Sequence, residues 1–112
     1  MKDRNQLYEG MYIISSSLSE DARGKALSRI TSSIEEHGGK IEKTHDWGRR
    51  KLAYSIDRKK EGHFYILYYT LPASQMKELW EEYKLNEDLL RFMTTTAESV
   101  KEKIEFKSLN PS

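Results

Sequence analysis

The chain has 112 residues, which suit one domain with a modest core and are too few for two full domains. Hydrophobic residues make up 37% of the chain and charged residues 33%, a balance too apolar for disorder and too polar for a bilayer-spanning protein. Cysteine is absent, which excludes disulfides, thiolate metal sites and a thiol nucleophile. The first residues lack the apolar run of a signal peptide, so we expect a cytosolic protein without a membrane partner.

The net charge of +1 conceals a segregation of charge along the chain. Residues 1–63 carry 13 basic and 10 acidic side chains, whereas residues 64–112 carry 6 basic and 8 acidic ones. The positive excess lies between positions 49 and 60, where Asp57 alone opposes six cations, namely Arg49, Arg50, Lys51, Arg58, Lys59 and Lys60. Such a segment is either a solvated surface or, where folding clusters it in space, a phosphate-binding surface.

The first half of the chain predicts a strand, a helix and a second strand. β-Branched and aromatic residues over 7–16 indicate the first strand. Ser19 can cap a helix whose apolar stripe continues to Ile34 and whose end is marked by Gly38-Gly39. Residues 41–56 then predict an edge strand of mixed polarity, with a bend or bulge at Gly48.

The second half predicts a hairpin, a helix and a final strand. The charged residues 57–62 are expected to form the hairpin connection, and residues 63–71 a central strand because both of its faces are apolar. Met76, Leu79, Trp80 and Tyr83 form the stripe of a second helix that should end near Asn86. Residues 89–96 are the last strand, so we expect a domain over 1–96 and a polar C-terminal tail over 97–112.

This order of elements predicts an α+β fold of the ferredoxin-like type, βαββαβ, with a four-stranded antiparallel sheet and two helices on one face. Glu9 and Arg91 cannot lie beneath the helices without a large desolvation cost, so they should mark the open face and are candidates for a cross-strand pair. Clustered apolar residues on an open face indicate a docking surface. The predicted members are Met11, Ile13, Phe64, Ile66, Tyr68, Thr70 and Met93.

The open face does not fit a base-stacking platform like that of an RNA recognition motif. Residues 62–68 and 11–14 echo its two strand motifs loosely. The stacking aromatic positions would be His63, Tyr65 and Tyr12, which the face assignment above buries beneath the helices.

Catalysis has little support in the sequence. His37, His45 and His63 show no metal-ligand spacing and no acid that recurs beside them at a fixed register. There is also no phosphate loop and no strand-turn-serine elbow. We therefore expect no enzyme, no catalytic residue, no bound metal and no cofactor.

Four stretches together resemble the bacterial small-subunit ribosomal protein six family over about residues 7–96. In chain order they are Tyr8-Glu9-Gly10-Met11-Tyr12-Ile13, Trp47-Gly48-Arg49-Arg50-Lys51-Leu52-Ala53-Tyr54-Ser55-Ile56, Lys59-Lys60-Glu61-Gly62-His63-Phe64-Tyr65 and Leu90-Arg91-Phe92-Met93. The stretch around Gly48 to Tyr54 is the most specific of them.

The resemblance implies a structural constituent of the cytoplasmic small ribosomal subunit without a small-molecule substrate. Such a protein joins small-subunit ribosomal protein eighteen and binds the central domain of small-subunit rRNA during assembly. The resemblance assigns rRNA contacts to Arg91 and to Arg49–Lys51, and the hairpin charge adds Arg58, Lys59 and Lys60. It assigns the partner-protein contact to the open face and to the tail, including Phe106 and Leu109.

An alternative function stays open at this point. A ferredoxin-like regulatory domain would self-associate through its sheet and bind a small molecule, and it would need no basic edge.

Overall fold

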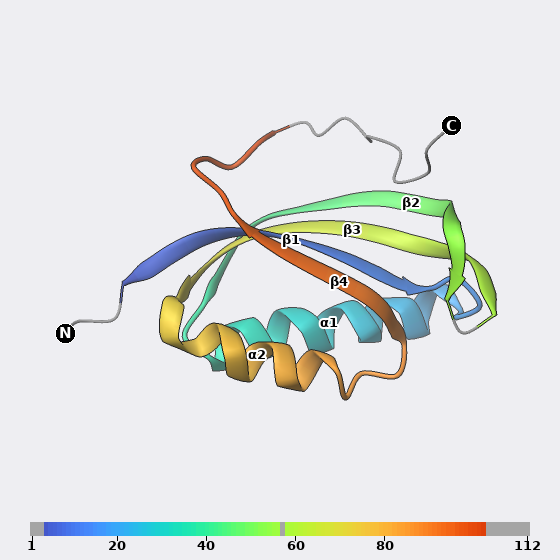
Figure 1. Ribbon diagram of the computed structural model, residues 1–112, viewed down its shortest axis with the longest axis horizontal. Coiled ribbons are helices and arrows are strands. Elements are labelled where there is room, and N and C mark those ends of the chain that lie inside the picture. The colour runs from blue at the N-terminus through green and yellow to red at the C-terminus, as the bar shows by residue number, and fades with distance from the viewer. Residues whose placement is uncertain (1–3, 57, 103–112) are drawn as a thin grey trace.

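The computed structural model describes residues 4–56 and 58–102. Its elements, in chain order, are β1 (Asn5–Ser15), α1 (Glu20–Glu36), β2 (Lys40–Ile56), β3 (Lys59–Pro72), the 3-10 helix η1 (Ala73–Gln75), α2 (Met76–Tyr83) and β4 (Leu89–Thr96). Figure 1 shows two layers, with the sheet on one side and both helices on the other. The expected sequence of strands and helices is therefore confirmed.

The four strands form one antiparallel sheet in the order β2-β3-β1-β4. β3 and β1 are central, while β2 and β4 are the two edges. The sequence patterns predicted the central place of β3 and the edge place of β2, and the predicted fold gave the places of β1 and β4. With both helices covering one face, this arrangement is the ferredoxin-like fold expected from the order of elements.

The register of the strands decides which side chains share a face. Glu9 lies opposite Tyr68 of β3 and Thr95 of β4, and the Tyr68 hydroxyl donates a hydrogen bond of 2.6 Å to the Glu9 carboxylate. Arg91 lies opposite Ile13, so the predicted cross-strand pair between Glu9 and Arg91 is wrong. Their shared face was predicted correctly, because neither belongs to the core cluster beneath the helices.

The hydrophobic core lies between the sheet and the two helices. Its buried members are Tyr8, Tyr12, Ile14, Ala26, Ile30, Ile34, Tyr65, Leu67, Tyr69, Leu71, Leu79, Tyr83 and Leu89. The hydroxyls of Tyr12 and Tyr83 are 2.7 Å apart, so each satisfies the hydrogen-bonding need of the other within the core. An RNA recognition motif would stack bases at the positions of Tyr12, His63 and Tyr65. All three side chains are buried, so they cannot form a base-stacking platform.

α1 begins and ends where its sequence predicts. The Ser19 hydroxyl accepts a hydrogen bond of 3.1 Å from the Ala22 amide, which satisfies a free donor of the first turn. At the other end Gly38 has a φ of +87°, and the Gly39 amide donates to the Ile34 carbonyl at 2.8 Å. The left-handed backbone of Gly38 is the reason that glycine ends this helix.

α2 ends at Tyr83, three residues before the predicted end at Asn86. The difference comes from a turn in which the Asn86 amide donates to the Tyr83 carbonyl at 3.1 Å. The Asn86 side chain also accepts a hydrogen bond of 3.1 Å from the Asp88 amide. Asparagine side chains that bond the nearby backbone compete with helix formation, so the buried Asn86 directs the chain into β4.

His37, at the end of α1, contacts η1 and α2. Its Nδ1 is 2.9 Å from the Gln75 side-chain oxygen, its Nε2 contacts the Glu82 carboxylate, and the Glu78 carboxylate lies 3.9 Å from Nδ1. Hydrogen bonding to Gln75, and then to Glu82, raises the pKa of His37 above its ordinary value of 6.5. The imidazolium form thus stabilises the contact between the two helices.

Replacing His37 with Gln is expected to remove a pH-dependent part of the stability. Because the folded-state pKa is raised, the wild-type advantage is fully present below about pH 6.5 and is lost as the pH rises through the folded-state pKa. Chemical denaturation of both proteins over this pH range measures the difference in unfolding free energy. A difference that does not change with pH would contradict the role of the charged imidazole.

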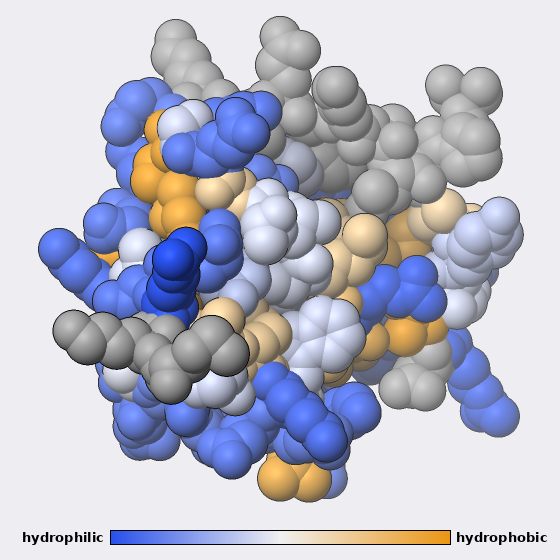
Figure 2. Space-filling view, turned by 60° about the vertical axis from the view of Figure 1, so that its left-hand side comes forward, coloured by the Kyte–Doolittle hydropathy of each residue, from blue (hydrophilic) through white to orange (hydrophobic). Residues whose placement is uncertain are grey.

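The face of the molecule shown in Figure 2 is mostly hydrophilic. In the view of Figure 2, apolar residues occupy small, separate areas among hydrophilic ones. Within residues 4–56 and 58–102, the helices are too short or too polar to cross a membrane.

Candidate nucleic-acid interface

The outer part of the β2–β3 hairpin carries most of the predicted RNA-binding cations. We call residues 49–56 and 58–61 the basic arm. The two strands pair as far as Ile56 and Lys59, so the turn is much tighter than the expected connection over residues 57–62. Arg58 has a φ of +66°, in the left-handed region that hairpin turns require. β3 accordingly begins at Lys59 instead of at His63.

Two irregularities in β2 give the basic arm its shape. Gly48 has a φ of +80° and donates its amide to the Asp46 carboxylate at 2.8 Å, which confirms the predicted bulge. Farther out, residues 52–55 lie opposite Lys60 alone, between the pairs Lys51–Glu61 and Ile56–Lys59. Bulges increase strand bending, and Figure 1 shows the end of the hairpin turned toward the helix side of the sheet.

The end of the basic arm is attached to the turn between β1 and α1. The Ser16 hydroxyl donates to the Glu61 carbonyl at 3.3 Å, and the Lys59 ammonium donates to the Ser17 hydroxyl at 3.2 Å. The arm is therefore held at its tip as well as at its base.

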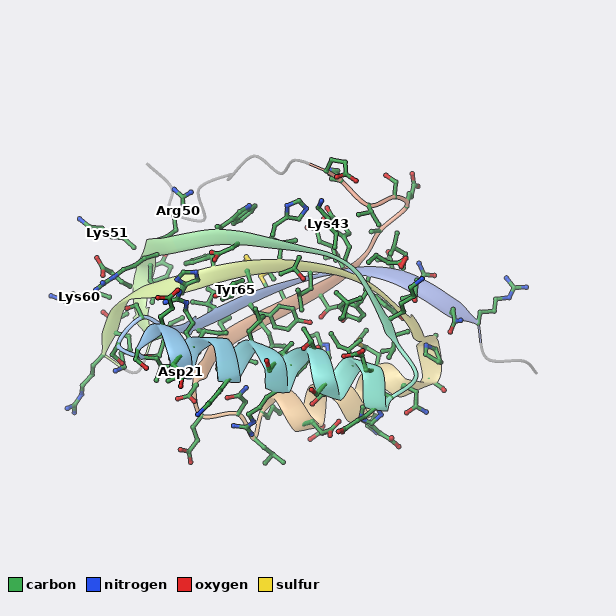
Figure 3. All side chains as sticks on the ribbon, turned by 180° about the vertical axis from the view of Figure 1, so that it is seen from behind. Asp21, Lys43, Arg50, Lys51, Lys60 and Tyr65 are labelled. Atoms are coloured by element: carbon green, nitrogen blue, oxygen red, sulfur yellow. The ribbon has the colours of Figure 1, made fainter. Side chains whose placement is uncertain are left out.

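The six cations of the basic arm differ in their contacts. Arg49 forms an ion pair of 2.6 Å with Glu61, and Arg50 donates to the Trp47 carbonyl at 3.2 Å. Lys59 is half-buried and the other five are exposed. Figure 3 shows Arg50, Lys51 and Lys60 projecting outward from the same end of the sheet. The hairpin thus brings together the two groups of cations, 49–51 and 58–60, as the sequence suggested.

A groove runs along the basic arm. It has a volume of about 650 Å³, and Leu52 and Ala53 contribute apolar surface to it. The charged side chains that line it are Arg49, Lys51, Arg58, Lys59, Lys60 and Glu61. Among the described residues, five cations against one carboxylate make this groove attractive to an anion such as a phosphate.

Arg91 lies away from the basic arm. Its strand, β4, is the edge opposite to β2, and Arg91 is in register with Ile13 and Phe64 across the sheet. Three strand spacings separate it from Gly48 at the base of the arm, or about 14 Å. The predicted RNA-binding residues therefore form one cluster of six and one separate cation.

The face of the sheet opposite the helices is not bare, which corrects the expected open face. Ile13, Phe64, Ile66 and Tyr68 are exposed by 2%, 1%, 2% and 0%, respectively. Met93 remains 49% exposed and Met11 is half-buried.

Residues 97–102, which we call the return segment, contact both β1 and β2 of the sheet. The Ala97 amide donates to the Leu7 carbonyl at 2.9 Å, His45 Nε2 lies 2.8 Å from the Lys101 carbonyl, and Lys43 forms an ion pair of 3.0 Å with Glu102. The chain therefore passes from the β4 edge, across β1 and β3, to the β2 edge. Figure 3 places Lys43 on this side of the sheet, away from the helices. The predicted contacts Phe106 and Leu109 lie outside the described residues.

The histidines serve the fold. His63 and Asp46 are 2.6 Å apart and join β3 to β2, while the His45 ring packs edge-on against Tyr68. Among the residues that the structure describes, no three His, Asp or Glu side chains are grouped so that they could hold a metal ion.

Sequence reasoning missed two features of the basic arm. It placed Glu61 in the connection, whereas Glu61 lies in β3 opposite Lys51 and its carboxylate forms an ion pair with Arg49, which reduces the available charge. The sequence analysis also gave no role to Tyr54, whose side chain is 77% exposed. The aromatic residue inside a cationic segment was the available signal for the second feature.

Fold and surface together define a small ferredoxin-like domain that presents a cationic groove on an extended hairpin. The comparisons with known proteins are specific about its class. Residues 7–96 match the family described as Ribosomal protein S6. The chain belongs to this family.

Relatives with the same description cover almost the whole chain. The small ribosomal subunit protein bS6 of Protochlamydia amoebophila is 58% identical over 104 residues, 93% of this chain and 91% of that protein. The Chlamydia pneumoniae protein is 56% identical over 108 residues, 96% of each chain. These relatives are structural proteins of the small subunit, so the predictions of a non-enzymatic ribosomal protein located in the cytoplasmic ribosome are confirmed.

Solved structures support the same conclusion. The 30S ribosomal protein S6 of Thermotoga maritima has a TM-score of 0.78 and 30% identity, covering 84% of this chain and 89% of its own. A P2 domain of the chemotaxis kinase CheA has a TM-score of 0.58 at 12% identity, covering 84% of this chain and 100% of its own. That second likeness concerns the fold alone. Because the chain belongs to a ribosomal family, the alternative of a small-molecule regulatory domain is not needed. Membership of this family implies ribosomal RNA and ribosomal protein as partners.

Proposed function

We propose that the chain binds the central domain of small-subunit rRNA through the basic arm, together with small-subunit ribosomal protein eighteen, during assembly of the subunit. The cation-lined groove supports this proposal most directly. It unites two groups of basic residues that are separated in sequence, and among the residues that the structure describes Glu61 is the one carboxylate that lines it.

Phosphate contacts in such a groove would supply affinity and orientation. Each Lys or Arg that neutralises a phosphate releases counterions, which makes binding depend steeply on salt. Arg91, on the other edge of the sheet, would add a separate contact and so help to set the orientation of the RNA.

Replacing both Lys51 and Lys60 with Gln is expected to weaken rRNA binding and to flatten its salt dependence. Both side chains line the groove and project to solvent. The slope of log affinity against log salt should fall by about one for each phosphate that the variant no longer neutralises. The measurement is a titration of the central-domain rRNA with this chain and ribosomal protein eighteen at several salt concentrations.

The control for this experiment replaces Lys25 and Lys77 with Gln. These residues lie on α1 and α2 and are exposed, so the variant has the same net charge as the test variant. Equal slopes for the two variants would show that the total charge, and not the groove, determines binding.

The sheet face is our proposal for the contact with ribosomal protein eighteen. Met93 and Met11 lie opposite each other on β4 and β1 and offer the accessible apolar surface. Ile13, Phe64, Ile66 and Tyr68, which the sequence also suggested, are buried and are not part of this proposal, whereas Phe106 and Leu109, which lie outside the described residues, remain proposed contacts. Omitting ribosomal protein eighteen from the titration tests the joint binding, since an unchanged affinity would exclude cooperation between the two proteins.

A further inference from the structure

Tyr54 stands apart from the other aromatic residues of the described chain. It is 77% exposed, whereas most tyrosines of this protein are buried in the core. It lies in the basic arm, among residues 52–55, where β2 departs from its ladder with β3. An aromatic ring held in water gives the core nothing, so its role has to be sought at the surface.

The ring lies beside the groove without lining it. Leu52, Ala53 and Ser55 line the groove, whereas Tyr54, between Ala53 and Ser55, does not. Cations that can hold phosphates therefore line the groove, and an exposed aromatic ring stands next to it on the same segment.

We infer that the basic arm binds an unpaired segment of RNA, with phosphates along the groove and one base stacked on the Tyr54 ring. This inference rests on the proposed function and specifies the form of RNA recognised. A base within a duplex is already stacked and cannot reach a protein ring, whereas unpaired bases stack readily on tyrosine. The excess of five cations over one acid among the described residues of the groove favours RNA over a protein segment as the occupant.

Substitution of Tyr54 separates stacking from charge. Tyr54→Leu keeps an apolar side chain but removes the ring, and Tyr54→Phe keeps the ring. With a short single-stranded RNA as the probe, Tyr54→Leu should bind between about 5-fold and about 150-fold more weakly than wild type. Tyr54→Phe should stay within about twofold of wild type, and binding of an RNA duplex should not respond to either change.

The possible outcomes distinguish this inference from the proposed function. Loss of affinity in Tyr54→Leu and its retention in Tyr54→Phe support stacking. Wild-type affinity in Tyr54→Leu, while the Lys51 and Lys60 double variant binds weakly, overturns stacking and leaves the charged interface intact. Equal weakening of single-stranded and duplex binding by Tyr54→Leu overturns it as well, because the ring would then only support the fold of the arm.

Photocrosslinking examines the same contact in assembled particles. Small ribosomal subunits that contain 4-thiouridine in their RNA are irradiated, and the crosslinked peptides are identified by mass spectrometry. We expect a crosslink in the peptide that contains Tyr54, to a nucleotide that is unpaired in the subunit. A crosslink from Tyr54 to another ribosomal protein, to a paired nucleotide, or to neither RNA nor protein would overturn the inference.

Discussion

Replacing Leu79 with Ala is expected to lower the free energy of unfolding by about 2–5 kcal/mol. Leu79 has no exposed surface, and it and Tyr83 are the two buried residues of the short helix α2. Truncation removes apolar packing and leaves a cavity between α2 and the sheet, which the short helix can fill only in part. Chemical denaturation followed by far-ultraviolet circular dichroism measures the change.

Leu85→Ala is the matched control. Leu85 lies just beyond the same helix, but its side chain is 75% exposed, so the same substitution should change stability by no more than about 0.5 kcal/mol. Similar losses at the two positions would mean that α2 is not attached to the sheet through Leu79.

Replacing Gly39 with Ala should also destabilise the protein, by about 1–3 kcal/mol. A Cβ atom at this position would lie 2.6 Å from Ile34 Cγ2, 2.7 Å from the Thr70 carbonyl oxygen and 2.8 Å from the Ile34 carbonyl oxygen. Two of these three neighbours are backbone atoms, which cannot move aside as a side chain can. The substitution therefore forces α1 and β3 apart at the point where the chain enters β2.

Gly24→Ala provides the opposite result from the same chemical change. Gly24 lies within α1, and a Cβ there would meet nothing within 4 Å. Alanine should stabilise this helix by about 0.5–1 kcal/mol because glycine loses more backbone entropy on folding. Denaturation curves of the two variants should shift in opposite directions, and a gain in stability from Gly39→Ala would contradict the close packing described here.

Local patterns predicted much of this fold. The Ser19 cap, the glycine end of α1, the bulge at Gly48 and the bounds of β4 each depend on neighbouring residues, which the sequence displays directly. The order of strands followed from the few ways in which such elements can connect. The length of the hairpin was wrong because Lys59–Glu61 read as polar turn residues, whereas their pairing with β2 places them in a strand.

The candidate site was predictable only to the extent that it is local. Clustering of the arm cations follows from a single hairpin, whereas the groove depends on residues 52–55 opposing Lys60 alone, a register that no pattern specifies. The burial of Ile66 and Tyr68 and the course of the return segment over the sheet depend on contacts between residues more than fifty positions apart. Local sequence patterns do not predict contacts between residues so far apart in the chain.

The return segment also has a mechanical consequence. Edge strands ordinarily fray first, each on its own, because each has a neighbour on one side only. Here the return segment that follows β4 contacts Lys43 and His45 on β2, the opposite edge strand. The return segment thus links the two edge strands, so that opening of either edge has to break these contacts or carry the segment with it.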